Sequence, residues 1–309
     1  MLCHQGSRMA LAATSKRKNP RRNTESVSVN PNPRDFALYA TYMTYPVQLP
    51  TSENSALWSS VPPARMSTFL RETPNGTADE ALNLYLWDRN LATAFLADLA
   101  IVEVALRDAL HRAATNEWGV YWYEEMPLDS RSEKSLKDAW SRLPKQLQRN
   151  PHRSDIPGRL VANCMFGFWT NLLDQGGYTG LGPRRRRISY DDNWQALRKA
   201  FPGGRREADR QRRNSPSHPD EITFSRAWVF QVCKRVKDIR NRVAHHEPVL
   251  NGFPLKGQSS NGAGRRLSPL EAHEEILSLS RMVDRGMASW LQRNSKVPQI
   301  WANKPPLGP

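Results

Sequence analysis

Apolar residues recur every three or four positions through most of residues 63–296, which is the spacing of amphipathic helices. The longest stretch covers residues 78–114, and Thr77 with Glu80 resembles a capping box at its start. It predicts one long helix, or two in sequence if the chain bends at residues 88–90. Its apolar positions are Leu82, Tyr85, Leu86, Leu91, Phe95, Leu99, Val102, Leu106 and Leu110.

Shorter periodic stretches predict the remaining helices. Residues 132–147 form an amphipathic stretch that Pro144 ends or kinks, and residues 156–174 are apolar almost all round, which predicts one central buried helix. Residues 193–202 predict a short helix, and residues 268–294 predict the last one, with Ser268 as its cap.

A helix of about six turns is predicted between residues 222 and 247. We expect it to stop near His246 or Glu247, because Pro248 disfavours helical backbone in the residue before it. One of its faces is apolar and predicts a core contact. That face consists of Phe224, Trp228, Val232, Val236, Ile239 and Val243.

Strand patterns are almost absent and no internal repeat is visible. Residues 203–219 predict a mobile loop and residues 251–269 a second loop, because Gly, Pro, Ser and charged residues dominate both. The expected fold class is therefore all-α. We expect a helical domain over residues 63–296, a disordered basic tail over residues 1–62 and a disordered C-terminal tail over residues 297–309.

The N-terminal tail mixes basic, Ser, Asn and Pro residues without periodicity. Such a segment can bind RNA, act as a localisation arm, or be an extension that results from choosing too early a start codon. We favour a non-specific tail or such an extension, and the charge pattern alone does not decide among the three.

Charge adds a partner class to this picture. The chain has 45 Lys and Arg against 30 Asp and Glu, a formal net charge of +15. This excess favours a polyanion such as RNA, although a basic tail that aids solubility gives the same total. Eleven basic and four acidic residues lie between positions 183 and 213, beginning with Arg184, Arg185, Arg186 and Arg187. This run is either a solvated face or an RNA-docking loop.

The three cysteines are scattered and form no CxxC pair, so we expect no disulfide framework and a reducing, cytoplasmic setting. Cys164 and Cys233 lie in apolar stretches and are expected to be buried. No run of 18 apolar residues exists, which predicts no membrane-spanning helix. Four isolated histidines are expected at the surface rather than as ligands, and Trp118, Trp122 and Tyr123 are expected in a packed corner between helices. The histidines are His111, His152, His218 and His273.

The densest chemistry lies in the stretch RVKDIRNRVAHHEPVL, residues 235–250. Asn241 and His245 are four apart and share one helix face. Arg240 and His245 are five apart, roughly 140° around an ideal helix, so they converge only if the last turn loosens or His245 swings round the helix end. A His that moves protons beside an Arg that holds a phosphate suits phosphodiester chemistry. A capped and solvated helix end has the same spacing.

A metal site made of His245, His246 and Glu247 is disfavoured, because adjacent histidines rarely converge on one ion and no further ligand is placed. We therefore expect neither a metal nor a cofactor. Glu103 and Arg107 are four apart on the long helix. They are either an exposed ion pair or part of a cleft that faces the helix of residues 222–247.

The segment RNRVAHHEP resembles the signature of Abi-like proteins, the abortive-infection family of the HEPN superfamily. The stretches ALNLYLWDRNLATAFLADLAIVEVALRDAL and GRLVANCMFGFWTNLL are similar to that family in the same order, so the likeness covers about residues 65–295. It implies a HEPN-like helical bundle whose Arg-x4-6-His motif maps onto Arg240, Asn241 and His245.

The resemblance also implies a function. Many HEPN proteins are metal-independent endoribonucleases that dimerise, so the expected partners are RNA, a second copy and an RNA or protein antitoxin, with a role in phage defence. Arg242, His246 and Glu247 would support the motif, with Arg242 and His246 together binding a flanking phosphate, and the family tends to carry Glu103 and Arg107. The rival hypotheses are a non-catalytic helical module that binds RNA or protein, and a metal-dependent hydrolase.

Overall fold

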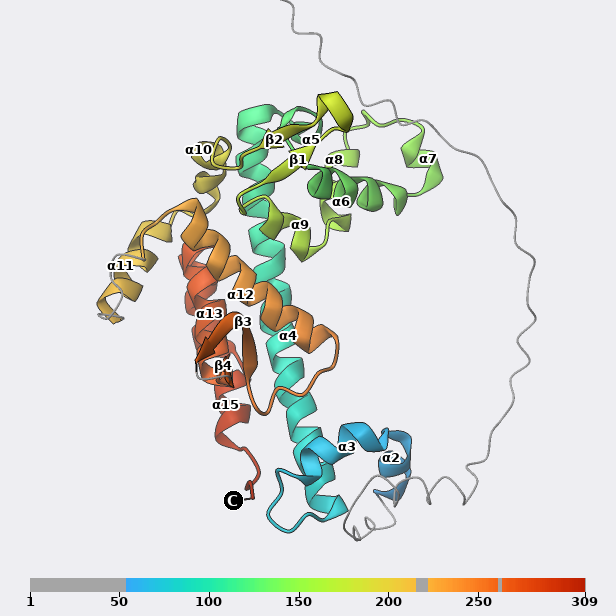
Figure 1. The fold of residues 1–309 in the computed structure, drawn as a ribbon, viewed down its shortest axis with the longest axis vertical. Helices are drawn as coiled ribbons and strands as arrows, with labels where there is room; N and C mark the ends of the chain where they lie inside the picture. Colours follow the sequence, from blue (N-terminus) through green and yellow to red (C-terminus); the bar gives the residue numbers. More distant parts are fainter. Residues whose placement is uncertain (1–53, 215–221, 261–262, 309) are drawn as a thin grey trace, which may run out of the picture.

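The computed structural model describes residues 54–214, 222–260 and 263–308, and it is mostly helical (Figure 1). The expected all-α class is therefore confirmed, while strands are confined to two short antiparallel hairpins within the described residues. None of the described helices is both long enough and apolar enough to cross a membrane.

One long helix, α4 (Ala78–Trp118, 41 residues), runs the length of the molecule (Figure 1). Thr77 caps it as predicted, since its side chain accepts a hydrogen bond from the Glu80 backbone N–H. The chain does not break at residues 88–90. The predicted apolar face is largely buried, but Leu86 is 40% exposed and lies outside the core.

The other elements pack around α4, so the core follows this helix from end to end. The helices α3 (Pro63–Leu70), α12 (Arg226–Ala244) and α13 (Pro269–Val283) lie directly against it. In chain order the remaining helices are α2 (Ser55–Ser60), α5 (Trp122–Glu125), α6 (Ser130–Ser141), α7 (Lys145–Gln148), α8 (Ile156–Asn163), α9 (Phe166–Asn171), α10 (Trp194–Leu197), α11 (Gly204–Asn214), α14 (Arg285–Asn294) and α15 (Val297–Ala302), with single 3₁₀ turns at Gly182–Arg184 and Arg198–Ala200.

Two predicted helices are each broken into two. Residues 156–174 form α8 and α9, because Cys164 and Met165 take extended backbone conformations between them. The break lets α8 pack on α6 while α9 packs on α4 and α12, so a stretch that is apolar all round finds several partners. Residues 268–294 break at Asp284, whose side chain accepts from the Met287 N–H at 2.7 Å and caps α14.

The predicted loop at residues 203–219 is wrong over residues 204–214, which form α11. Glu207 is 2% exposed there and accepts hydrogen bonds from Arg210 and from Arg281 of α13. Burial opposes ionisation of Glu207, but these hydrogen bonds outweigh it and lower its pKa to about 2. The charges that indicated a solvated loop therefore fix α11 against α13. Residues 215–219 lie outside the described residues.

This pairing predicts a specific loss of stability in acid. An unfolded glutamate has a pKa of about 4.5, so the depressed pKa of Glu207 stabilises the fold fully above pH 4.5 and less as the pH falls towards 2. Between pH 6 and pH 3 the free energy of unfolding should fall by about 2 kcal/mol more in the wild type than in Glu207→Gln. Urea unfolding at both pH values measures this. Equal losses in both proteins would contradict the assignment.

The loop predicted at residues 251–269 is also wrong, because β3 (Phe253–Ser260) and β4 (Ala263–Leu267) form an antiparallel hairpin. Phe253 and Leu267 face each other in register and are buried, and the Phe253 ring packs edge-on against Phe95 of α4. A second hairpin, β1 (Gly177–Thr179) with β2 (Arg186–Ile188), follows α9.

Order extends further at both ends of the domain than predicted. Residues 297–302, expected in the C-terminal tail, form α15, and its Trp301 packs against Trp87 with ring centroids 5.8 Å apart. Residues 55–60, expected in the N-terminal tail, form α2, while residues 1–53 lie outside the described residues.

Buried single residues both confirm and correct the sequence predictions. Cys164 and Cys233 are buried as predicted, and burial raises the pKa of each thiol to about 12. Trp122 lies in the predicted inter-helix corner, where its indole N–H donates to His111 Nδ1 at 2.9 Å. The surface position predicted for His273 is wrong, because this residue is only 6% exposed.

Candidate functional site

Helix α12 places the motif residues at its C-terminal end. Ser225 caps its start by accepting from the Trp228 N–H at 3.2 Å, and the predicted apolar face is buried from Trp228 to Val243, with Phe224 lying just before the helix. Arg240 and Asn241 are half-buried on the other side of the last turn, so they stand at the boundary between core and solvent.

The helix ends at Ala244, earlier than predicted, in a Schellman motif. The N–H of Glu247 donates to the Arg242 carbonyl at 3.1 Å, and the N–H of His246 donates to the Val243 carbonyl at 3.0 Å. His246 takes the left-handed conformation with φ 56°, which a non-glycine residue adopts at a cost of roughly 1–2 kcal/mol. The helix thus ends sharply at His245, and its last turn does not loosen.

Two residues of α4, Asp88 and Arg89, hold the segment after this end in place. Asp88 is fully buried, and its Oδ1 accepts from the backbone N–H groups of Val249 and Leu250 at 2.8 and 2.7 Å. Arg89 pairs with Asp88 and donates to the carbonyls of His246 and Glu247, each at 3.0 Å. Sequence reasoning missed both residues. The available signal was an aspartate at a core position of an otherwise apolar helical face.

Arg65 of α3 adds a further anchor, because its guanidinium also donates to the His246 carbonyl. The left-handed residue is therefore held by side chains from two other helices, α3 and α4 (Figure 1). These contacts support the strained conformation and fix the direction in which the chain leaves His245.

The motif residues border two hollows that share Asn241. A hollow of about 230 Å³ is lined by His245, Asn241, Arg242 and Glu247 together with residues of α12 and the β3–β4 hairpin. A second hollow of about 320 Å³ lies between α6, α9 and α12 and is lined by Arg240 and Asn241. The structure thus brings Arg240 and His245 to neighbouring hollows, without direct contact between them within one chain. The His245 side chain is exposed and hydrogen-bonds to none of the described residues.

Glu103 of α4 turns towards the motif helix, although neither Glu103 nor Arg107 lines either hollow. Its Oε2 lies 3.3 Å from Nε of Arg240, which orients the guanidinium at the wall of the second hollow. Arg107 does not pair with Glu103 among the described residues. Its Nη1 donates instead to the Ala162 carbonyl at 3.3 Å, at the C-terminal end of α8.

Arg242, predicted to bind a flanking phosphate together with His246, is engaged within its own turn. Arg242 forms an ion pair with Glu247 at 2.8 Å and donates to the Pro248 carbonyl at 3.1 Å. These contacts close the turn after α12 on itself. Similarly, Asn241 contacts His245 through the backbone, where its carbonyl accepts from the His245 N–H at 2.9 Å.

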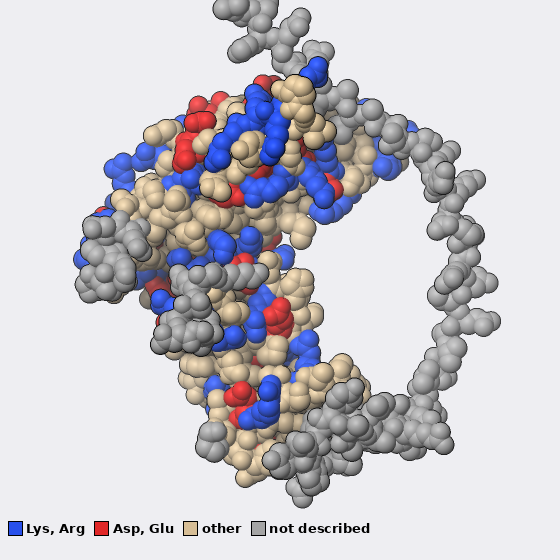
Figure 2. All heavy atoms as spheres, in the orientation of Figure 1, with Lys and Arg blue, Asp and Glu red and all other residues tan. Residues whose placement is uncertain are grey.

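The four consecutive arginines lie on the β1–β2 hairpin. Arg184, Arg185, Arg186 and Arg187 are all exposed, and none forms an ion pair with another described residue. Arg185 stacks over the Tyr178 ring, with its Cζ atom 4.1 Å from the ring centroid. Figure 2 shows basic side chains gathered at the top of the molecule over this hairpin.

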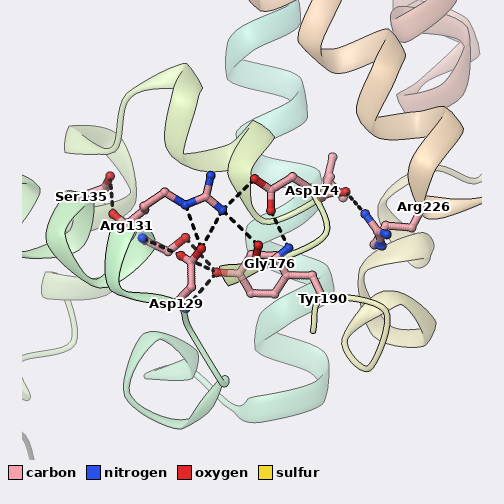
Figure 3. A network of polar contacts seen from close by, with 9 residues as sticks. Asp129, Arg131, Ser135, Asp174, Gly176, Tyr190 and Arg226 are labelled. Carbon is pink, nitrogen blue, oxygen red and sulfur yellow. Dashed lines mark hydrogen bonds and ion pairs between the residues drawn. The ribbon is translucent and has the colours of Figure 1, made fainter. Parts of the chain in front are cut away.

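A polar network fixes the base of this hairpin (Figure 3). Arg131 of α6 pairs with Asp129 at 2.7 Å and with Asp174 at 2.8 Å, while the Tyr190 hydroxyl bonds to Asp129 and to Ser132. Burial opposes ionisation of Asp129, but its hydrogen bonds from Ser132 and Arg131 outweigh it and lower its pKa. The arginines therefore project from a fixed support.

Among the described residues, no group of three or more His, Cys, Asp or Glu side chains is arranged to hold a metal ion. Comparisons with protein-family models, with curated proteins and with solved structures give no match to this chain.

Proposed function

We propose that the protein is a HEPN-type endoribonuclease that cleaves RNA without a metal ion. The observation that supports this most directly is the exposed imidazole of His245 at a fixed helix end, at a hollow that adjoins the one lined by Arg240, whose guanidinium Glu103 orients. An unengaged imidazole is suited to proton transfer, and a held guanidinium in the adjoining hollow is suited to stabilise the charge of a phosphate. The resemblance of RNRVAHHEP to the Abi-like motif supports the same activity.

In the proposed reaction His245 accepts the proton of a ribose 2′-OH. The 2′-oxygen then attacks the adjacent phosphorus, and Arg240 stabilises the more negative phosphorane. The bond from phosphorus to the 5′-oxygen breaks, and that oxygen takes up a proton from water or, in a dimer, from the protonated His245 imidazole of the second copy. The products are a 2′,3′-cyclic phosphate and a 5′-hydroxyl, and DNA is inert because it lacks the 2′-OH.

Because the Arg240 guanidinium and the His245 imidazole are not in contact, the reaction requires a particular position of the phosphate. A phosphate that contacts both Arg240 and His245 of one chain has to lie over Asn241, which borders both hollows. In the homodimer that the resemblance implies, the second copy would instead supply the complementary acid or base.

The test is cleavage of a mixed-sequence RNA by the purified protein, with and without a chelator. We expect cleavage that survives the chelator, leaves 2′,3′-cyclic phosphate ends and spares the matching DNA. Cleavage that stops with the chelator would support a metal-dependent hydrolase instead. Binding without cleavage would support the second candidate, a non-catalytic RNA-binding module, which the exposed arginines of the β1–β2 hairpin favour.

We further propose that the activity serves phage defence in the cytoplasm, either as abortive infection or as the toxin of a toxin–antitoxin pair. This role rests on the family resemblance alone. Expression of the wild type should then slow cell growth, and Arg240→Ala should restore it. Equal slowing by both proteins would contradict a catalytic origin of the toxicity.

The basic hairpin carries a prediction of its own about RNA binding. If Arg186 and Arg187 contact phosphates, replacing both by glutamine should reduce the slope of log K against log salt by about 1.4, since each contact to a single strand contributes about 0.7. Fluorescence anisotropy with a labelled oligonucleotide at several salt concentrations measures the slope. The control is Arg285→Gln with Arg293→Gln, two exposed arginines of α14. Equal salt slopes in the two double variants would show that the hairpin arginines are solvated and do not contact phosphates.

A further inference from the structure

The hollow between α6, α9 and α12 carries more cationic side chains than the proposed chemistry uses. Besides Arg240 it is lined by Lys237, one helical turn earlier on α12, and by Arg142 at the end of α6. Figure 2 shows that the surface is concave between the region of α6 and the end of α12. Asp138 is the one carboxylate among the residues that line the hollow.

These cations differ in how far they are already engaged. Arg240 is held by Glu103 at 3.3 Å, and Arg142 uses Nη1 to donate to the Asn163 carbonyl at 3.1 Å, which leaves its other guanidinium donors available. Lys237 forms no ion pair with any other described residue. A mobile ammonium at the wall of a concave site is suited to bind a phosphate as a point charge.

We propose that this hollow binds one nucleotide of a single-stranded RNA next to the scissile phosphate, with Lys237 and Arg142 holding its phosphate group. This inference rests on the proposed function, because it assigns the neighbouring subsite to the same substrate. The hollow adjoins the His245 hollow through Asn241, so a strand bound in one continues into the other.

The size of the hollow fits an unpaired strand. A volume of about 320 Å³ lies at the lower end of the range of about 300–1,000 Å³ that small-molecule sites occupy. A hollow of this volume has room for about one nucleotide. An unpaired strand can place successive nucleotides in two adjoining hollows because its bases are free to splay apart, whereas the bases of an A-form duplex are stacked and paired.

The hollow contains charges of both signs, so substitutions of Lys237 and of Asp138 should shift RNA affinity in opposite directions. Residues with a purely structural role would not give this result. The probe is a labelled single-stranded 2′-O-methyl oligoribonucleotide, which binds as RNA does but lacks the attacking hydroxyl. Lys237→Gln should weaken its binding by about tenfold, because it removes a charged phosphate contact. Asp138→Asn should tighten binding by about threefold, because it removes a negative charge facing the phosphate.

The matched control is Lys137→Gln, which makes the same change at an exposed lysine of α6 that does not line the hollow. It should leave the affinity within twofold, and thermal unfolding should be unchanged in all three variants. The same oligonucleotide annealed to its complement should bind at least tenfold more weakly than the single strand.

Failure of this inference is separable from failure of the proposed function. If Lys237→Gln and Asp138→Asn both match Lys137→Gln, if the duplex binds as tightly as the single strand, or if the oligonucleotide does not bind, the subsite is overturned even where RNA cleavage persists. If the two variants shift affinity in opposite directions while no RNA is ever cleaved, the subsite stands and the nuclease proposal falls.

Discussion

Replacement of His245 by alanine is expected to reduce the rate of RNA cleavage by about 10²–10⁴-fold, the usual contribution of a general acid or base. The imidazole hydrogen-bonds to none of the described residues and is exposed, so its removal takes away proton transfer without removing a structural contact. The free energy of unfolding should change by less than about 0.5 kcal/mol. Single-turnover cleavage and urea unfolding measure the two effects on the same preparation.

The control for this experiment is His152→Ala, which removes another exposed histidine at a position far along the chain from the motif. It should retain the wild-type cleavage rate. A His245→Ala protein that cleaves as fast as His152→Ala would end the proposal that this imidazole carries protons in the reaction.

Substitutions of Arg240 can distinguish the effect of its positive charge from the effect of its orientation. Arg240→Lys keeps a positive charge but loses the Nε–H that lies 3.3 Å from Glu103, so the cation is no longer held in one place. If orientation matters, Arg240→Lys should lose most of the activity that Arg240→Ala loses. Recovery of near wild-type cleavage in Arg240→Lys would show that charge alone suffices.

Two long helical patterns were predictable because each has one strong apolar face. Residues 78–114 and 222–247 show helical periodicity in the sequence, and α4 and α12 follow it closely. What periodicity did not show is where a helix breaks while its pattern continues. The breaks at Cys164 and Asp284 depend on which neighbouring helices are available, and Asp284 acts as a cap only once α14 turns away.

Charged and turn-rich segments were the least predictable. The composition of α11 resembles that of a solvated loop, and it became helical because Glu207 is satisfied by Arg281 from a helix almost 75 residues later in the chain. Likewise β3 and β4 pair through Phe253 and Leu267, whose burial depends on the presence of α4 beneath them. Such long-range partners are not visible in local sequence patterns.

The sequence predicted which residues form the candidate site at the end of α12, but not which contacts they make. The spacing of Arg240, Asn241 and His245 indicated the end of one helix, and the structure places them there. The sequence spacing suggested that Glu103 pairs with Arg107, four residues later on α4. It could not show that Glu103 pairs instead with Arg240 of α12. Nor could it show that the helix ends in a Schellman motif held by Asp88 and Arg89.

The anchor at Asp88 is expected to matter more for stability than any exposed charge. Asp88→Ala leaves the N–H groups of Val249 and Leu250 without an acceptor in a buried environment and removes the partner of Arg89. Removal of one partner of a buried pair costs about 3–5 kcal/mol, so the free energy of unfolding should fall by roughly that amount. Urea unfolding at pH 7 measures the loss.

Asp108 of α4 offers a closely matched control. It also pairs with an arginine of its own helix, Arg112, at 3.1 Å, but both side chains are more than half exposed. Asp108→Ala should therefore cost less than about 1 kcal/mol. Asp88→Asn keeps an oxygen that can accept both N–H groups and should fall between the two alanine variants. Equal stability of Asp88→Ala and Asp108→Ala would show that the segment after α12 does not depend on this carboxylate. The position of His245 would then have to be set by the Schellman motif together with the guanidinium contacts of Arg65 and Arg89.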